Sequence, residues 1–204
     1  MIEVKIQNIF PTPLMLIENK KGITKEEKIT IDKYKKNSYF DLSHTYTQDN
    51  QVLLNKGLKQ LKHFIEFGIE AYVNNIICPK NKLNFYITES WINYNNYNDF
   101  THPHTHPNSI ISGVYYIDTL KDDLIQFLKP KDQIRIEPTN YNDYNSGSKQ
   151  IPIKNNLLIL FPSTLEHSVL HNKQIPHKQR TSLAFNTFVK GKINETFSTN
   201  LWLK

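Results

Sequence analysis

From residue 83 onward, the chain is divided into short apolar segments separated by turn-forming residues. The segments read LNFYITESWINY, SIISGVYYI, DLIQFLK, IPIK, LLILF and TSLAFNTFV. They are rich in β-branched and aromatic residues, and the 3.6-residue period of a helix gives way here to strand-like runs. This half therefore predicts a mainly β fold, an antiparallel sandwich or jelly roll. Asn155 and Asn156 lie between IPIK and LLILF and predict a two-residue hairpin turn, because asparagine tolerates positive φ.

One amphipathic helix is predicted ahead of these strands, over residues 50–77. Its apolar residues recur at spacings of three and four: Leu54, Leu58, Leu61, Ile65, Ile69, Tyr72 and Ile76. Asp49 or Asn50 would cap its start, and Pro79 follows its end. Further upstream, residues 20–36 are rich in charge, and we interpret them as a solvated segment rather than an exposed helix. Residues 1–10 and 14–17 predict two short strands or strand-like arms.

Length and composition favour one domain at residues 1–204. Arms and a supporting helix would occupy residues 1–80, and the β core residues 83–190. The net charge of +6 is spread over the chain, so we expect a basic surface and no nucleic-acid partner. The single cysteine, Cys78, excludes an internal disulfide framework. With no apolar run of membrane-spanning length and no export signal, a cytoplasmic protein without a membrane partner is expected.

Histidines gather in the segment THPHTHP, directly before the strand SIISGVYYI. On an extended chain His104 and His106 would point to the same side, roughly 6 to 7 Å apart, and could bind one metal ion. His102 and His104 form an alternative pair. A further histidine, His167, follows the strand LLILF. Without clustered thiolates the ligands are nitrogen and oxygen, which suits iron(II), with manganese, cobalt, nickel or zinc as other occupants.

Arg180 opens the segment RTSLAFN, thirteen residues after His167. In a strand, Arg180 and Ser182 would lie on one face. The planar guanidinium of arginine binds a carboxylate through two parallel hydrogen bonds, and a serine hydroxyl can add a third. A surface ion pair is the alternative role for this arginine. Its position after His167 favours an anion-binding site.

These segments together resemble the 2-oxoglutarate and iron(II)-dependent oxygenase superfamily. The closest resemblance is to a small bacterial and phage group, similar to prolyl hydroxylases, with the patterns W-x-N, H-x-H-P, S-G-V-Y-Y, F-P-S-x-x-x-H and R-x-S-x-x-F-N. The five patterns occur in the family's order over residues 83–189. The resemblance implies a double-stranded β-helix, a cupin-like jelly roll, with the N-terminal helical segment packed on it.

By this resemblance, His104 and His167 are metal ligands, and His106 stands where the superfamily usually has Asp or Glu. The metal and catalytic residues would then be three histidines, with His102 at the rim. Arg180 and Ser182 would bind the far carboxylate of 2-oxoglutarate. Further residues of the cofactor pocket would be Tyr116, Asn93 and Asn186, with Tyr115 and Trp91 as additional lining candidates.

The implied activity is that of a dioxygenase that uses Fe(II), 2-oxoglutarate and O2, with ascorbate as an auxiliary candidate. It would hydroxylate a C–H bond of a peptide or small-molecule substrate, prolyl side chains being the first expectation, and release succinate and CO2. A cupin-type metal-binding protein without oxygenase activity is the main alternative, although the glutamate that cupins carry shortly after H-x-H is missing at residues 109–111. A structural or nucleic-acid-binding protein would leave Arg180 and the FPS segment before His167 without an explanation.

Overall fold

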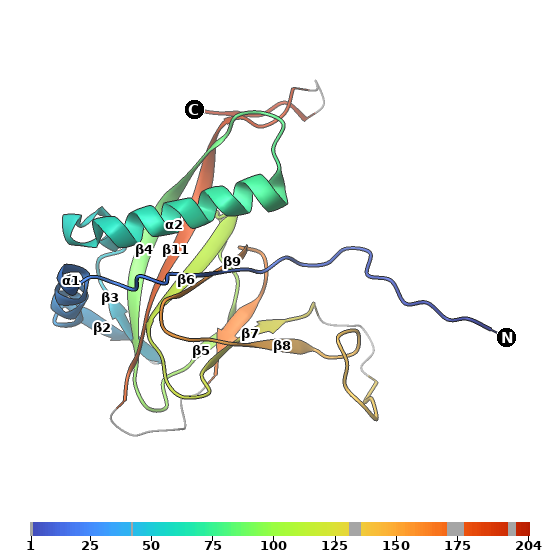
Figure 1. Cartoon of the computed structure of the whole chain (residues 1–204), viewed down its shortest axis with the longest axis horizontal. Coiled ribbons are helices and arrows are strands. Elements are labelled where there is room, and N and C mark those ends of the chain that lie inside the picture. Colours follow the sequence, from blue (N-terminus) through green and yellow to red (C-terminus); the bar gives the residue numbers. More distant parts are fainter. Residues whose placement is uncertain (1, 42, 131–135, 171–177, 196–198) are drawn as a thin grey trace.

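The computed structural model describes residues 2–41, 43–130, 136–170, 178–195 and 199–204. Two antiparallel sheets pack face to face, and helix α2 (Lys59–Tyr72) lies across the outer face of the larger sheet (Figure 1). The predicted mainly β fold of the jelly-roll type is therefore confirmed.

The larger sheet has the order β1-β9-β6-β11-β4-β3-β2, and β12 pairs with β11. In that order its strands are Met15–Glu18, Leu157–Pro162, Ile111–Asp118, Arg180–Lys192, Asn84–Asn95, His44–Thr47 and Ser38–Asp41, with β12 at Trp202–Leu203. The smaller sheet has the order β5-β10-β7-β8, with strands Thr101–His104, His167–Val169, Leu124–Leu128 and Ser148–Pro152. All six segments that the sequence marked as strands form strands. The short strands β2, β3, β5, β10 and β12 were not predicted.

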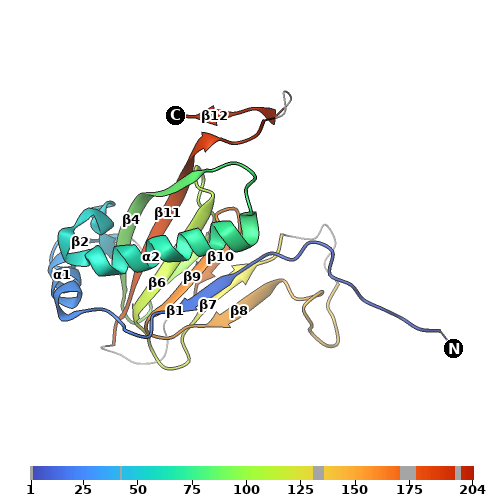
Figure 2. The ribbon, with the colours of Figure 1, turned by 45° about the horizontal axis from the view of Figure 1, so that its top comes forward.

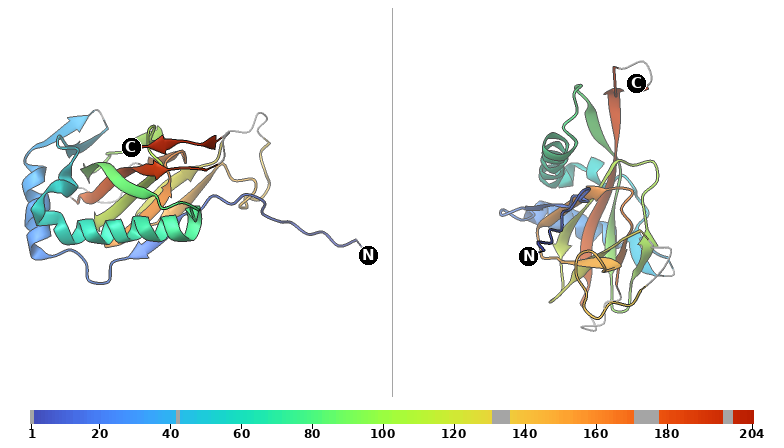
Figure 3. Two further views of the ribbon diagram at one scale, coloured as in Figure 1. Left: turned by 90° about the horizontal axis from the view of Figure 1, so that it is seen from above. Right: turned by 90° about the vertical axis from the view of Figure 1, so that its right-hand side faces the viewer.

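Strand β9 of the larger sheet is buried on both faces, which explains its unbroken apolar run LLILF. Leu158 and Leu160 face α2, whereas Ile159 and Phe161 face the smaller sheet. The first cluster is formed chiefly by Leu61, Ile65, Ile69, Ile92, Tyr115, Leu158, Leu160, Leu183 and Phe185. The second is formed by Val114, Tyr116, Ile125, Phe127, Ile153, Leu157, Ile159 and Phe161. Figures 2 and 3 show α2 on the side of β4, β6 and β11 that carries the first cluster.

Helix α2 begins nine residues later than the periodicity predicts, because the chain from residue 52 to 58 forms two 3-10 turns (Val52–Leu54 and Lys56–Leu58). Asp49 is therefore not the cap of this helix, and the Leu58 side chain that precedes it provides no cap. A π-helical turn, Val73–Ile77, carries the helix to Cys78, near the predicted end. The close packing of α2 on the sheet depends on Gly68, where an added Cβ would lie 2.6 Å from Cδ2 of Leu158.

The charged segment at residues 20–36 contains a regular helix, α1 (Lys25–Lys35), so our preferred interpretation as a solvated segment without a helix was wrong. Thr24 and Glu27 form a capping box, a signal that outweighs the β-branched residues inside the helix. Glu27 is buried, and its second carboxylate oxygen accepts the N–H of Leu61 in the first turn of α2. Glu27 thus serves the starts of both helices.

Two further predictions need correction. Asn155 and Asn156 do not form a β8–β9 hairpin, because β8 pairs with β7 in the smaller sheet and β9 pairs with β6 and β1 in the larger one. Asn156 does adopt positive φ, 66°, but in a turn that crosses between sheets. At the N-terminus, β1 confirms the second predicted arm, whereas the described residues 2–10 form no strand. No helix in the described parts of the chain has the length and apolar character needed to cross a membrane.

Candidate metal centre

Two short strands of the smaller sheet bring three histidines together. His104 ends β5 and His167 begins β10, and these two residues are direct cross-strand partners. His106 follows β5, and its backbone N–H donates to the carbonyl of Ser163 at 3.0 Å, which fixes the chain just before β6. One ring nitrogen from each histidine lies within 4.8 Å of the other two. This spacing fits a single metal ion bound by three imidazoles.

The far ring nitrogens of two of these histidines are held by backbone carbonyls. Nδ1 of His104 lies 2.8 Å from the carbonyl oxygen of His102, and Nδ1 of His167 lies 3.0 Å from that of Leu165. A carbonyl oxygen accepts only, so each Nδ1 carries the proton and each Nε2 keeps its lone pair. Nε2 of His167 lies 3.3 Å from Nε2 of His106. Such carbonyl contacts orient histidine ligands in metal sites.

Burial, followed by the proximity of His104, lowers the pKa of His106 to about 4 and that of His167 to about 3. Neutral imidazole is the form that binds a metal ion. His106 and His167 are therefore in their metal-binding protonation state at neutral pH.

His102 does not join this group. It is exposed, and its ring packs edge-on against Phe100 with the ring centroids 4.7 Å apart. Its backbone carbonyl, rather than its ring, contributes to the site by accepting from His104.

A cavity of about 340 Å³ opens beside the three histidines, between the two sheets. Among the residues predicted for a cofactor pocket, Arg180, Ser182, Tyr116 and Asn93 line this cavity, as does Trp91. Arg180, Ser182 and Ala184 alternate along β11, and their β4 partners Asn95, Asn93 and Trp91 stand opposite in that order. The wall is therefore one face of a strand pair. A larger groove of about 950 Å³ lies between α2 and β4, but none of these candidate residues lines it.

Two predicted pocket residues lie elsewhere. Tyr115 points to the other face of β6, where its hydroxyl donates to Asn156. Asn186 lies behind His106, with its amide nitrogen 3.4 Å from Nδ1 of that ring, and it donates to Glu89 at 2.6 Å. Its amide oxygen accepts from the hydroxyl of Ser112. Asn186 therefore contacts a candidate ligand rather than the cavity.

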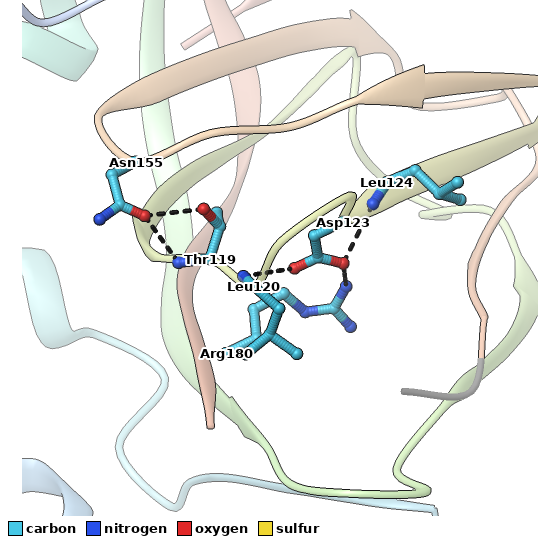
Figure 4. A network of polar contacts seen from close by, with 6 residues as sticks. All are labelled: Thr119, Leu120, Asp123, Leu124, Asn155 and Arg180. Atoms are coloured by element: carbon cyan, nitrogen blue, oxygen red, sulfur yellow. Dashed lines mark hydrogen bonds and ion pairs between the residues drawn. The ribbon is translucent and has the colours of Figure 1, made fainter. Parts of the chain in front are cut away.

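Arg180 is held by an acid that the sequence did not reveal. Its Nη1 donates to Oδ1 of Asp123 at 2.9 Å, with the two side chains 4% and 11% exposed. Nη2 of Arg180 is buried without a hydrogen-bond partner among the described residues. Figure 4 shows the pair beside the start of β7. Asp123 precedes Arg180 by 57 positions, so no local spacing pattern could have joined the two.

Three other cavity residues were also missed. His44 and Tyr46 belong to the unpredicted strand β3, and Asn95 ends β4. Burial lowers the pKa of His44. Only the strand alternation in SWINYN could have pointed to Asn95, since it continues the face of Trp91 and Asn93.

Comparison with known proteins relates this geometry to a family. Residues 89–186 match the family model described as "Putative 2OG-Fe(II) oxygenase". No curated protein matches the chain. Among solved structures, a 2OG-Fe(II) oxygenase family oxidoreductase from Burkholderia pseudomallei is 12% identical, with a TM-score of 0.57 over 85% of this chain and 83% of that one.

Two other structures have the same fold. HygX from Streptomyces hygroscopicus, solved with nickel, 2-oxoglutarate and hygromycin B, is 8% identical, with a TM-score of 0.56 over 86% of this chain and 82% of that one. A prolyl-4-hydroxylase from Pseudomonas putida is 10% identical, with a TM-score of 0.53 over 86% and 92%. At these identities the likeness concerns the fold.

Proposed function

Given that residues 89–186 of this chain belong to the 2OG-Fe(II) oxygenases, we propose that the protein is a dioxygenase that depends on Fe(II) and 2-oxoglutarate. The observation that carries the proposal is the group of three histidines beside a cavity that is also lined by a buried arginine, Arg180. A metal-binding protein without oxygenase activity would account for the histidines. It would leave the buried, unpartnered Nη2 of Arg180 without a function.

His104, His106 and His167 would hold the iron through one ring nitrogen each. All three are neutral ligands, so the two positive charges of the ion are not balanced by the protein. A dianionic co-substrate supplies that balance. Bound together, Fe(II), 2-oxoglutarate and O2 supply oxidation of a C–H bond with release of succinate and CO2. The residues of this chain orient these groups and exclude water from them.

Arg180 would bind the far carboxylate of 2-oxoglutarate, with Ser182 beside it on the same face of β11. The unpartnered Nη2 of Arg180 provides a donor, and Tyr116, the cross-strand partner of Ser182, also lines the cavity. Burial raises the pKa of Tyr116, so its phenol stays protonated. A carboxylate that accepts from Nη2 would remove the cost of leaving this donor unpaired.

For the substrate, we propose a C–H bond in a peptide side chain, with proline first, or in a small molecule. Support comes from the fold shared with a prolyl-4-hydroxylase and with HygX, whose structure contains hygromycin B. His44 and Tyr46 line the cavity from β3, which is separated from Arg180 by β4, and this part of the cavity is left for the substrate.

The test is succinate release by purified protein with Fe(II), 2-oxoglutarate, O2 and a panel of prolyl peptides and small metabolites. We expect succinate formation that requires iron and is lost in His104→Ala and His167→Ala. Ascorbate would be included in parallel assays as a possible auxiliary. His102→Ala serves as the matched control, because it removes a neighbouring imidazole that lies outside the group. Metal binding by the wild type without 2-oxoglutarate binding or turnover would favour the cupin-type alternative.

A further inference from the structure

Asp123 lies between the two sheets, next to the cavity-lining Arg180. It belongs to the connection between β6 and β7, whereas Arg180 is the first residue of β11 in the larger sheet. Its Oδ1 accepts from Nη1 of Arg180, and the two side chains are only 11% and 4% exposed, respectively. The pair therefore holds the cavity-lining Arg180 in place and is not an exchangeable surface contact.

The carboxylate of Asp123 has little freedom to move. Besides Arg180, Oδ1 accepts the N–H of Leu124 at 3.0 Å, and Oδ2 faces the N–H of Leu120 at 3.4 Å. The backbone carbonyl of Asp123 accepts the N–H of Ile153 from the chain after β8. Figure 4 shows the contacts of the Asp123 carboxylate with Arg180, Leu120 and Leu124, and the hydrogen bonds from Thr119 to Asn155 in the same region. The carboxylate that holds Arg180 is thus itself fixed by hydrogen bonds from the backbone.

Because Asp123 occupies Nη1 of Arg180, Nη2 is the terminal nitrogen that remains for a ligand. Nη1 is taken by Asp123, while Nη2 is buried and without a partner among the described residues. Nδ2 of Asn95, the cross-strand neighbour of Arg180, is a second buried donor without a partner. Both residues line the cavity. A carboxylate accepts only, so it can satisfy two such donors.

We propose that Asp123 is a positioning residue that sets the length of 2-oxo acid the site accepts. The inference rests on the proposed function, because it takes Arg180 as the partner of the far carboxylate. Asp123 neutralises the charge of Arg180, so attraction to the ligand depends mainly on the directed hydrogen bond from Nη2. A hydrogen bond weakens steeply with distance and angle. The fixed Nη2 therefore favours a chain of one length between the metal and the far carboxylate.

The experiment measures dissociation constants by calorimetry on Mn(II)-loaded protein with four 2-oxo acids. Oxaloacetate is one carbon shorter than 2-oxoglutarate, 2-oxoadipate is one carbon longer, and pyruvate lacks the far carboxylate. We expect the wild type to bind 2-oxoglutarate most tightly. In Asp123→Ala its affinity should fall by about tenfold, and the preference over 2-oxoadipate should shrink, because Arg180 is no longer held. Pyruvate and Mn(II) should bind as before.

Three variants separate position from charge and from folding. Asp123→Asn keeps an oxygen that accepts from Nη1, so it should retain the length preference. Asp123→Glu keeps the charge but moves the carboxylate by one methylene toward Arg180, so the preference should shift toward oxaloacetate. Asp122→Asn removes an exposed charge one residue away and should change nothing. Asp123→Asn and Asp123→Glu also keep the test decisive if Asp123→Ala does not fold.

The proposal is overturned if the wild type prefers 2-oxoglutarate and all three Asp123 variants keep that preference. It is also overturned if pyruvate and 2-oxoglutarate lose affinity equally, since that would indicate general damage to the site. A wild type that binds Mn(II) and pyruvate but shows no gain from a far carboxylate would refute the role of Arg180. That result would remove the proposed co-substrate together with this inference.

Discussion

Three histidines, with no carboxylate among them, form the candidate metal centre in the described part of the chain. By the sequence resemblance alone, His106 would stand where the oxygenase superfamily usually has an acid. His104 and His167 are each held by a backbone carbonyl at Nδ1, whereas His106 is contacted by Asn186. The net charge of a bound ion together with its protein ligands would therefore depend on whether residue 106 is a histidine or an acid.

We expect His106→Ala to lose metal, because two imidazoles would remain. His106→Asp should keep it, because a carboxylate oxygen can replace the ring nitrogen. His102→Ala should retain metal content, since its ring packs on Phe100. Metal analysis after dialysis against Fe(II) or Mn(II) measures all three. Loss of metal in His102→Ala together with retention in His106→Ala would contradict the assignment.

Arg180→Leu should abolish measurable 2-oxoglutarate binding while leaving the metal content nearly intact, because the charged donor is lost but the histidines are not touched. It should also lower the free energy of unfolding by about 3 kcal/mol, since Asp123 would stay buried without its partner. Arg180→Lys should restore part of both losses, having the charge without the planar fork.

Calorimetry with 2-oxoglutarate and urea unfolding measure the two effects separately. The double variant Arg180→Leu with Asp123→Leu removes the stranded charge, so stability should recover without any recovery of binding. Equal 2-oxoglutarate affinity in wild type and Arg180→Leu would point to another anchor.

For single residues, the sequence could predict those that belong to a short recognisable pattern, such as H-x-H or alternation along a strand. His104, His106 and His167 lie together, and Arg180 and Ser182 share a strand face. Asp123 and His44 could not be found in this way, because Asp123 meets Arg180 across 57 positions of the chain and His44 reaches the cavity from a short strand without a marked pattern.

The helices show a similar limit at the level of elements. The apolar period located α2, but its true start depends on an acid from another helix. Glu27 caps α1 through Thr24 and also accepts the N–H of Leu61 in α2. Periodicity describes which face of a helix is buried, and it carries no information about a distant side chain that satisfies the first turn.

Glu27→Ala should therefore destabilise both helices at once, by about 2 kcal/mol, because a buried N–H of α2 and the capping box of α1 lose their acceptor. Glu27→Gln should cost less, since it keeps an acceptor oxygen. The exposed neighbour Glu26 provides the control, and Glu26→Ala should lie within about 0.5 kcal/mol of wild type. Urea unfolding followed by circular dichroism measures the differences. Equal losses for the two alanine variants would show that the contact with α2 adds nothing.

On the scale of the whole molecule, the candidate site spans the two sheets. His104 and His167 belong to the smaller sheet, and Arg180 belongs to the larger one. The strand content and the sandwich could be predicted because an alternating apolar segment needs one covered face and a continuous apolar run such as LLILF needs two. The sheet order could not be predicted, and the Asn155–Asn156 turn illustrates why. Asn156 has the positive φ of a hairpin residue, but the strands on either side pair in different sheets.

Metal and 2-oxoglutarate should stabilise the protein more together than the sum of their separate effects. A co-substrate that contacts both the ion and Arg180 would connect the sheets and balance the charge of the ion. At a concentration one hundred times the dissociation constant, a ligand adds about 2.7 kcal/mol. Thermal unfolding with Mn(II), with 2-oxoglutarate and with both measures the coupling. In Arg180→Leu the stabilisation by Mn(II) should remain and the extra stabilisation should disappear. Strictly additive shifts in wild type would argue against a shared site.

Trp91 lies close enough to the candidate metal centre for its fluorescence to report metal binding. Its ring lies 5.9 Å from that of His106, whereas the only other tryptophan, Trp202, is 69% exposed on β12. A paramagnetic ion held by the histidines should quench the emission of Trp91 and leave that of Trp202 unchanged. Titration with Mn(II) should thus reduce the fluorescence of wild type and of Trp202→Phe, but not that of Trp91→Phe. Occupancy of the centre could then be followed by light alone, without a label and before any substrate is identified.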